Sequence, residues 1–383
     1  MHHRSVARSS SARHARRRAR PLVRTAVTLA VALAAAACGG GEGGESTPTS
    51  TSAAVPDTTA EQTTTTSEQP AATTTEAPTT TAAATTTTEP GPPVYPLTGV
   101  IVGDPAVAAL PALVVKIDNA PGARPQSGMN EADIVIEEIV NDNLTRFAFV
   151  FHSQSADPVG PIRSGRIQDI DLFGSFNRPL FAWSGGNRTV TDAVRASDLV
   201  DIGPSRAPVY FRSSERRAPH NLYSTTGALW SQAPEGSAPP PQQFAYRSEG
   251  EAVQGVPSPG ALITLDAVDV GWEWDAALGL YRRSMEGRVH EDTLSGPVTT
   301  NNVVVLEMVY VPGISDSPDA QTIGSGRALV FTAGNYIEAT WSRGDRLAPF
   351  ALTTLDGQPV ELSPGRTFVE LPRIDKTIPL PAA

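Results

Sequence analysis

The 383-residue chain contains one cysteine, Cys38. A single cysteine excludes disulfide bonds within the chain and metal centres built from several thiolates. Histidine is also scarce beyond that cysteine, where His152, His220 and His290 lie far apart without the spacing of metal ligands. We therefore expect no metal site and no cofactor.

Common catalytic motifs are missing as well. The chain has no G-x-S-x-G, no H-E-x-x-H, no Walker phosphate loop and no calcium-binding loop. Ser164 has no obvious general base beside it in the sequence, so nucleophilic catalysis has no support. The sequence therefore identifies no reaction.

Basic residues are few, and many of them lie at the start of the chain. Residues 1–38 hold eight arginines and no acidic residue, so without them the formal charge of −10 becomes about −18. A chain of that charge is a poor candidate for binding nucleic acid or anionic lipid surfaces. We expect no nucleic acid partner.

The first 38 residues have the features of an export signal. Residues 1–24 are basic, and residues 25–37 form an apolar run too short to be a confident membrane span. The small residues before Cys38 and the glycines after it resemble a bacterial lipoprotein signal. That resemblance implies a lipid on Cys38, which would anchor the protein to the outer face of the cell membrane. The alternative is an ordinary signal peptide cleaved near Ala37.

Residues 39–93 are rich in Thr, Ala, Ser, Pro and Gly and contain no aromatic residue. Such a segment cannot bury enough apolar surface to offset the entropy lost on ordering. We predict a disordered tether that holds the folded part away from the membrane.

Two folded parts are predicted after the tether. Residues 94–250 combine strand-like runs with helical patterns at 167–176 and 189–196, which indicates a mixed α/β domain. Residues 255–372 show alternating, β-branched runs and turn residues without a helical period, which indicates a mostly β domain. Residues 373–383 are expected to be a tail.

A possible binding site lies at residues 163–166, which we call the arginine turn. Arg163 and Arg166 flank Ser164 and Gly165 where a turn leads into a helical pattern. A helix N-terminus disfavours cations, so two arginines there favour an anionic ligand. Arginine also binds carboxylate and phosphate through two parallel hydrogen bonds.

Further candidate ligand-binding residues follow strand-like runs or lie in a second basic loop. They are Arg124, Glu137, His220 and Asn221, with Arg146 as an alternative to Arg124 for holding the anion. His220 is the histidine best placed for proton transfer. The alternative is structural: the arginines would pair with acidic residues of the protein itself, and His220 and Asn221 would bond to the backbone of their own loop. The candidate acidic partners are Asp118, Asp133, Glu137, Glu138 and Asp169.

Several segments together resemble the YerB-like lipoproteins, a family of bacterial surface proteins without an assigned function. These segments are residues 124–128, 131–134, 145–147, 159–166 and 219–223. The resemblance implies a lipid-anchored, two-domain extracytoplasmic protein and supplies no catalytic residues. A binding or structural role is favoured, with a cell-wall polymer or its lipid-linked precursor as the anionic ligand.

Two other functions stay open. The order of Asp118, Arg124, Asp133 and a turn arginine is similar to that of the LytR-type wall-polymer ligases. That resemblance implies an envelope phosphotransferase or glycan-modifying enzyme that acts on lipid-linked phosphate. A protein-interaction scaffold is the third possibility, with Trp272 and Trp274 as its contact residues, although alternating aromatics are more often the buried face of a hairpin.

Overall fold

The computed structural model describes residues 91–248 and 250–382. The predicted signal segment, Cys38 and the tether up to residue 90 lie outside the described residues. Within the described ranges, no helix combines the length and the apolar content needed to cross a membrane.

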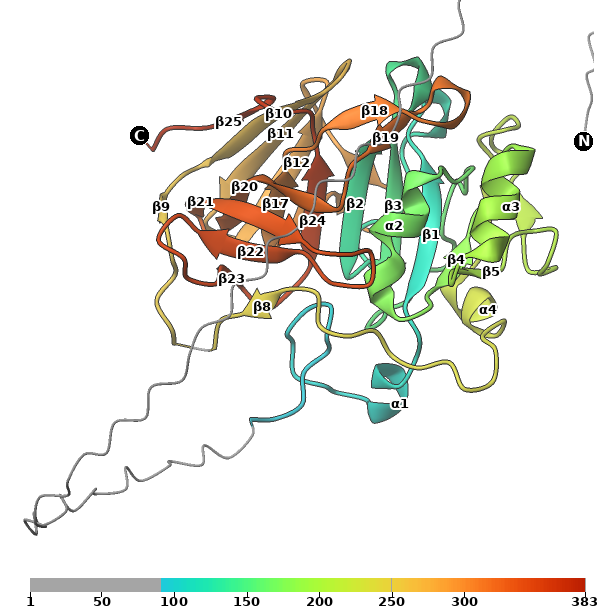
Figure 1. The fold of residues 1–383 in the computed structure, drawn as a ribbon, viewed down its shortest axis with the longest axis horizontal. Coiled ribbons are helices and arrows are strands. Elements are labelled where there is room, and N and C mark those ends of the chain that lie inside the picture. Colours follow the sequence, from blue (N-terminus) through green and yellow to red (C-terminus); the bar gives the residue numbers. More distant parts are fainter. Residues whose placement is uncertain (1–90, 249, 383) are drawn as a thin grey trace, which may run out of the picture. The chain divides into compact units, whose positions relative to one another are not determined.

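An 11-stranded sheet runs through the whole folded part, in the order β22-β21-β20-β17-β24-β2-β3-β1-β4-β5, with β9 also paired to β21 (Figure 1). Its strands are β1 (Leu113–Asp118), β2 (Ile134–Ile139), β3 (Thr145–Phe151), β4 (Leu180–Ala182), β5 (Val200–Asp201), β9 (Val256–Pro257), β17 (Asn302–Leu306), β20 (Gly324–Thr332), β21 (Asn335–Arg343), β22 (Ala351–Thr354) and β24 (Thr367–Leu371). Strand β24 lies parallel to both β2 and β17. The two predicted parts therefore share one sheet.

A second sheet of six strands has the order β13-β12-β11-β10-β25, with β16 also paired to β12. Its strands are β10 (Gly260–Leu265), β11 (Val268–Asp275), β12 (Leu280–Met285), β13 (Arg288–Val289), β16 (Thr299–Thr300) and β25 (Thr377–Pro379). The predicted hairpin between residues 271–274 and 280–284 is present as β11 and β12. Strand β25 belongs to the segment expected to be a tail, and it pairs with β10.

Short strand pairs and helices complete the fold. The pairs are β6 (Phe211–Arg212) with β7 (Leu222–Tyr223), β8 (Ala245–Tyr246) with β23 (Glu361–Leu362), β14 (Glu291–Asp292) with β15 (Gly296–Pro297), and β18 (Tyr310–Pro312) with β19 (Pro318–Ala320). The α-helices are α1 (Pro105–Ala108), α2 (Gln168–Leu172), α3 (Arg188–Ala196) and α4 (Thr226–Trp230); the 3-10 turns are η1 (Pro121–Ala123), η2 (Asn141–Asn143), η3 (Gly174–Phe176) and η4 (Ile314–Asp316). The α-helices of the described residues all precede residue 231.

The large sheet buries both of its faces. On one face, Phe147, Phe149 and Phe151 of β3 are fully buried in a core that includes Trp272 and Tyr281 of the second sheet. On the other face, the core contains side chains of α2 and α3. Each fully buried phenylalanine contributes about 1.5–3 kcal/mol relative to exposure. Charged residues on these strands are therefore held in a largely dry interior.

The helix expected over residues 167–176 is shorter than its pattern indicates. Helix α2 has five residues and ends at Leu172, and η3 follows it after Phe173. Gly174 there packs so closely against the carbonyl oxygen of Arg346 that a Cβ atom would lie 2.4 Å from it. One turn has only a small dipole, and Asp169 and Asp171 already lie in it. The predicted dipole argument for an anion at the arginine turn is therefore wrong.

Candidate functional site

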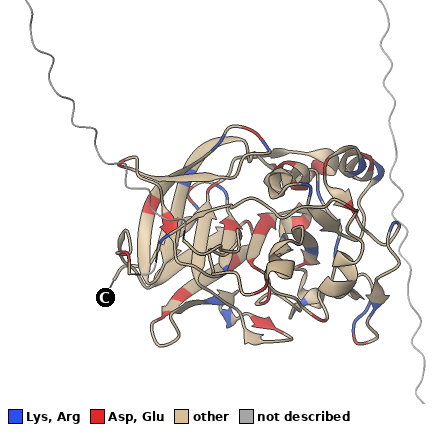
Figure 2. Cartoon of the chain, turned by 90° about the horizontal axis from the view of Figure 1, so that it is seen from below, with Lys and Arg blue, Asp and Glu red and all other residues tan. Residues whose placement is uncertain are grey.

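Three neighbouring strands carry charged residues of both signs into the middle of the large sheet (Figure 2). Glu138 of β2, Arg146 of β3 and Asp118 of β1 are register partners in one row. Lys116 lies on the same face because it precedes Asp118 by two residues. Glu137 is one residue from Glu138 and therefore points to the opposite face.

The arginine turn lies against the end of β1. The backbone N–H of Arg163 donates to the carbonyl oxygen of Lys116 at 2.8 Å, and the N–H of Ser184 donates to the carbonyl oxygen of Arg163 at 2.9 Å. A Cβ atom on Gly165 would lie 2.8 Å from the ring of Trp183. A larger residue would therefore push the turn away from this position.

Asp118 contacts two side chains of the predicted site, the guanidinium of Arg163 and the imidazole of His220. Its Oδ2 atom lies 3.0 Å from Arg163 Nε and 2.8 Å from His220 Nδ1. The carboxylate is 5% exposed, whereas the side chains of Arg163 and His220 are 28% and 26% exposed. A carboxylate only accepts, so Nδ1 of His220 carries the hydrogen and Nε2 is the acceptor in the neutral ring.

Arg146 and Arg166 bond to neutral oxygens. Arg146 Nη1 donates to the carbonyl oxygen of Ser164 at 2.8 Å. Arg166 donates to Ser317 Oγ at 3.1 Å, to the carbonyl oxygen of Gly165 at 3.0 Å and to Ser164 Oγ at 3.3 Å. Among residues 91–248 and 250–382, no carboxylate oxygen lies within 4.0 Å of a guanidinium nitrogen of Arg146 or Arg166.

Crowding of like charge is reflected in the pKa of these groups. Burial, and then the charges of Arg166 and Arg163, lower the pKa of Arg146 to about 10. Burial also lowers the pKa of Arg166, and the charge of Arg163 acts in the same direction against the attraction of Glu138 and Asp169. Three guanidinium groups thus lie close enough to influence one another, and within the described residues only that of Arg163 contacts a carboxylate, that of Asp118.

A surface hollow of about 200 Å³ lies beside Arg166. Its walls are formed by Gly165 and Arg166, the start of α3 and the turn at residues 314–317; the lining residues are Asn141, Gly165, Arg166, Ile167, Asn187, Val190, Ile314, Ser315 and Ser317. Asn187 caps α3 by accepting from the N–H of Val190 at 2.9 Å. The hollow thus brings a guanidinium, hydroxyls and amides together at the surface.

The acidic residues nearest the turn are already used by a buried lysine. Lys116 Nζ lies 2.6 Å from Glu138 Oε1 and 2.9 Å from Asp169 Oδ1, and all three side chains are at most 1% exposed. Burial and the charge of Asp169 raise the pKa of Glu138, and Lys116 opposes that rise. Glu138 and Asp169 therefore pair with Lys116 and make no such contact with Arg146 or Arg166.

Glu137 belongs to a separate ring of buried polar groups on the opposite face. Arg283 donates to Glu137 Oε2 and, at 2.6 Å, to His290 Nδ1. His290 Nε2 then donates to Gln126 Oε1 at 2.9 Å, Gln126 donates to Asn119 Oδ1 at 3.0 Å, and Asn119 donates to Glu137 Oε1 at 3.1 Å. Burial and the charge of Arg283 hold the pKa of His290 well below its usual value.

Arg283 also connects the two sheets. It lies 3.5 Å from Glu370 Oε1 of β24, which accepts a hydrogen bond from Trp272 Nε1 at 2.9 Å. Its guanidinium lies 4.9 Å from the ring centre of Phe368. Burial and the charge of Glu137 raise the pKa of Glu370 well above the usual value. These contacts hold the two sheets together and leave Glu137 without access to solvent.

Two other predicted residues bond within the protein. Arg124 Nε donates to the carbonyl oxygen of Asn119 at 3.1 Å, and its Nη1 atom lies 2.9 Å from Glu286. Asn221 accepts from Arg212 Nη1 at 2.7 Å. The structure therefore brings the arginine turn and His220 together around Asp118 and Arg146, and it places Glu137 and Arg124 elsewhere.

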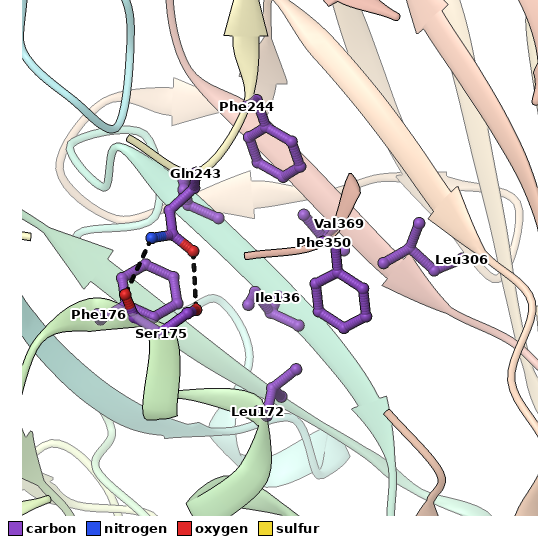
Figure 3. A pocket seen from close by; sticks show the side chains of 10 residues that line it. Ile136, Leu172, Ser175, Phe176, Gln243, Phe244, Leu306, Phe350 and Val369 are labelled. Carbon is purple, nitrogen blue, oxygen red and sulfur yellow. Dashed lines mark hydrogen bonds between the residues drawn. The ribbon is translucent and has the colours of Figure 1, made fainter. Parts of the chain in front are cut away.

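An apolar cavity lies under the segment before β8 (Figure 3). Gln243 closes it through two hydrogen bonds with Ser175, at 2.9 Å and 3.2 Å. Its volume of about 20 Å³ leaves room for about one water molecule, and apolar side chains such as Phe350 and Val369 form most of its wall. It is a packing gap and not a ligand site.

Lys116 was visible in the sequence but was not assigned to this site, whereas Arg146 was predicted as a further arginine of it. Lys116 and Arg146 interrupt apolar runs whose residues are buried on both faces. A charged residue in such a run must have a buried partner.

Within the described residues, no group of three or more His, Cys, Asp and Glu is arranged to hold a metal ion.

Comparison with known proteins places the chain in a described family. The chain belongs to the family described as "Protein of unknown function (DUF3048)", whose N-terminal domain matches residues 97–238 and whose C-terminal domain matches residues 263–369. A relative named "Putative lipoprotein YerB", from Bacillus subtilis (strain 168), is 28% identical over 300 residues, which cover 72% of this chain and 85% of that protein.

The crystal structure of the YerB protein from Bacillus subtilis has a similar fold. Its TM-score is 0.67, with 24% identity over 74% of this chain and 98% of that one. The predicted membership of a YerB-like family of unknown function is confirmed.

Proposed function

We propose that the protein is an extracytoplasmic lipoprotein, held by Cys38 at the outer face of the cell membrane, that binds an anionic ligand of the cell envelope at the arginine turn. The anchor is supported by the sequence around Cys38 and by the name of the Bacillus subtilis relative. The ligand class is a phosphate-containing wall polymer or its lipid-linked precursor.

One observation supports anion binding above the others. Arg146, Arg163 and Arg166 lie near one another, and within the described residues only Arg163 contacts a carboxylate, that of Asp118. Like charges this close repel one another unless a negative group is added. The hollow beside Arg166 offers space for that group, together with hydroxyl and amide donors. An anion bound there would receive charge-assisted hydrogen bonds, which are the stronger ones.

A scaffold function based on the tryptophans has less support. Trp272 is 1% exposed and packs on Phe368 with a ring-centre distance of 4.9 Å. Trp274 packs on Tyr281 at the same separation. The sequence interpretation of these aromatics as part of the protein core agrees with these contacts.

Replacing both turn arginines with glutamine is expected to weaken binding of poly(glycerol phosphate) by at least about 30-fold, because each charge-assisted hydrogen bond contributes about 1.5–3 kcal/mol. The measurement is a fluorescence titration of the full chain with a labelled polymer, for wild type and for Arg163→Gln/Arg166→Gln.

The matched control is Arg178→Gln/Arg288→Gln, which removes the same charge from two exposed positions that belong neither to the turn nor to the hollow. Equal weakening by the two double variants would indicate non-specific attraction and contradict the proposal. So would a wild-type protein that does not bind. Urea midpoints establish that each variant is folded.

Replacing Cys38 with serine is expected to move the protein from the membrane to the soluble fraction, because the lipid is attached to the thiol. Detergent-phase partitioning and incorporation of a labelled fatty acid, both on the full chain in a bacterial host, measure this. The matched control is Cys38→Ser/Ser46→Cys, which keeps one thiol but displaces it from the signal. Membrane retention of Cys38→Ser would show that another element anchors the chain, and a soluble wild-type protein without the fatty-acid label would show that the segment is an ordinary signal peptide.

A further inference from the structure

The imidazole of His220 is oriented in a way that ligand binding alone does not need. Its Nδ1–H donates to Asp118 Oδ2 at 2.8 Å, and this carboxylate is almost completely buried. Asp118 Oδ1 in turn accepts from the N–H of Ala120 at 3.1 Å. The carboxylate therefore fixes the tautomer of the ring and leaves Nε2 as the basic nitrogen, as in a general base oriented by a carboxylate.

Two loops hold the ring in place. The loop at residues 121–125 lies against it, since a Cβ atom on Gly122 would be 3.0 Å from Cδ2 of His220. Arg216 ties this loop to that of His220 by donating to the carbonyl oxygens of Gly122, Arg124 and Pro125, at 3.2, 3.1 and 2.6 Å. Within the described residues, Nε2 of His220 has no hydrogen-bond partner, and the side chain is 26% exposed.

Arg163 completes the arrangement. Its Nε atom lies 3.0 Å from the same Asp118 oxygen that binds His220, so the guanidinium and the imidazole are neighbours. Among the described residues, the terminal nitrogens of Arg163 have no hydrogen-bond partner either. An anion that accepts from these terminal N–H groups would lie next to Nε2 of His220.

We propose that this site hydrolyses phosphodiesters, with His220 as the general base and acid and Arg163 as the residue that binds the phosphate. The proposal rests on anion binding at the arginine turn and adds a reaction to it. Within the described part of the chain, the terminal N–H groups of Arg163 are free beside Nε2 of His220, and one guanidinium can pair with the single negative charge of a phosphodiester.

The reaction needs only water besides the diester. Nε2 of His220 takes a proton from water while the water oxygen forms a bond to phosphorus. The bond between phosphorus and the leaving alkoxy oxygen breaks, and that oxygen keeps the electron pair. It then takes the proton from Nε2, which returns the ring to neutrality. The products are one phosphomonoester and one alcohol. Asp118 is a positioning residue, because it holds Nδ1–H and stabilises the transient imidazolium.

The test is the release of phosphomonoester from poly(glycerol phosphate) by the full chain, followed by phosphorus NMR. His220→Ala is expected to lower kcat by roughly 100-fold or more and to leave KM within a few-fold, since general acid–base catalysis contributes about 10²–10⁴. Added imidazole should restore part of the rate to His220→Ala, which a purely structural role of the ring would not allow. Asp118→Asn should lower kcat and should not respond to imidazole.

The outcomes separate the two proposals. Binding of the polymer without release by the wild type overturns hydrolysis and leaves anion binding in place. The role of His220 is overturned if His220→Ala releases phosphomonoester as fast as the wild type. It is also overturned if His220→Ala keeps its urea midpoint but added imidazole restores none of its lost rate. A wild-type chain that neither binds nor cleaves the polymer overturns both. Faster cleavage of phosphomonoesters than of diesters would overturn the assigned substrate class.

Discussion

Arg283→Met is expected to destabilise the protein by about 3–5 kcal/mol, because it leaves buried carboxylates without their cation. Glu137 and Glu370 are register partners on β2 and β24, and the side chains of all three residues are 0% exposed. Without the guanidinium, one carboxyl must take up a proton or draw water into the core. The free energy of unfolding from urea titration measures the effect.

The neighbouring arginine provides the control. Arg282→Met removes the same charge from a side chain that is 56% exposed and pairs with Asp275 at the surface. That change is expected to stay within about 0.5 kcal/mol. Adding Glu370→Gln to Arg283→Met should recover part of the loss, because the amide oxygen can still accept from Trp272. Equal effects of Arg282→Met and Arg283→Met would show that the buried contacts do not stabilise the fold.

Lys116→Met is expected to cost a similar amount, about 3–5 kcal/mol, for a related reason. Lys116 stands between Glu138 and Asp169, and its removal leaves two carboxylates facing each other near Arg166. Lys376→Met is the matched control, since Lys376 is the other lysine of the chain and is exposed. A Lys376→Met effect as large as that of Lys116→Met would contradict this explanation.

The effect of Lys116→Met should also depend on pH. Burial and Asp169 already raise the pKa of Glu138 above 4.5, and loss of the lysine raises it further. A carboxyl whose folded pKa lies above its unfolded value stabilises the fold at low pH and loses that contribution as pH rises. The deficit relative to wild type should therefore be smaller at pH 5 than at pH 8. Urea midpoints at the two pH values test the sign.

Much of the strand structure could be predicted because its signals are local. The runs at 113–117 and 367–371 are β-branched and apolar, and they form β1 and β24 within one residue. The hairpin of β2 and β3 follows from two such runs joined by Asn141-Asp142-Asn143, and η2 forms there with Asp142 at φ 64°. The joining of the two parts into one sheet could not be predicted, because periodicity shows which face of a strand is buried and not which strand pairs with it.

For the candidate site, too, the sequence indicates individual residues but not the residues that they contact. The arginine turn and His220 stood out through their residue types, but the partners of each were not predictable. Arg283 and Glu137 are 146 positions apart in the sequence, and Asp118 and His220 are 102 apart. Only the fold decides which acid meets which base at such separations. The alternative that the arginines are neutralised internally holds for Arg163, which contacts Asp118, and not for the contacts of Arg146 and Arg166.

The position of β24 has a consequence for the order in which the molecule can assemble. Residues 367–371 occupy the place between β2 and β17, although they are made after all the other strands of that sheet. Until they arrive, β2 and β17 each present a row of unsatisfied backbone groups to solvent and to other chains. Such long-range pairing is slow to form. The unfinished polypeptide thus stays vulnerable to aggregation and to proteases until residues 367–371 are available to pair.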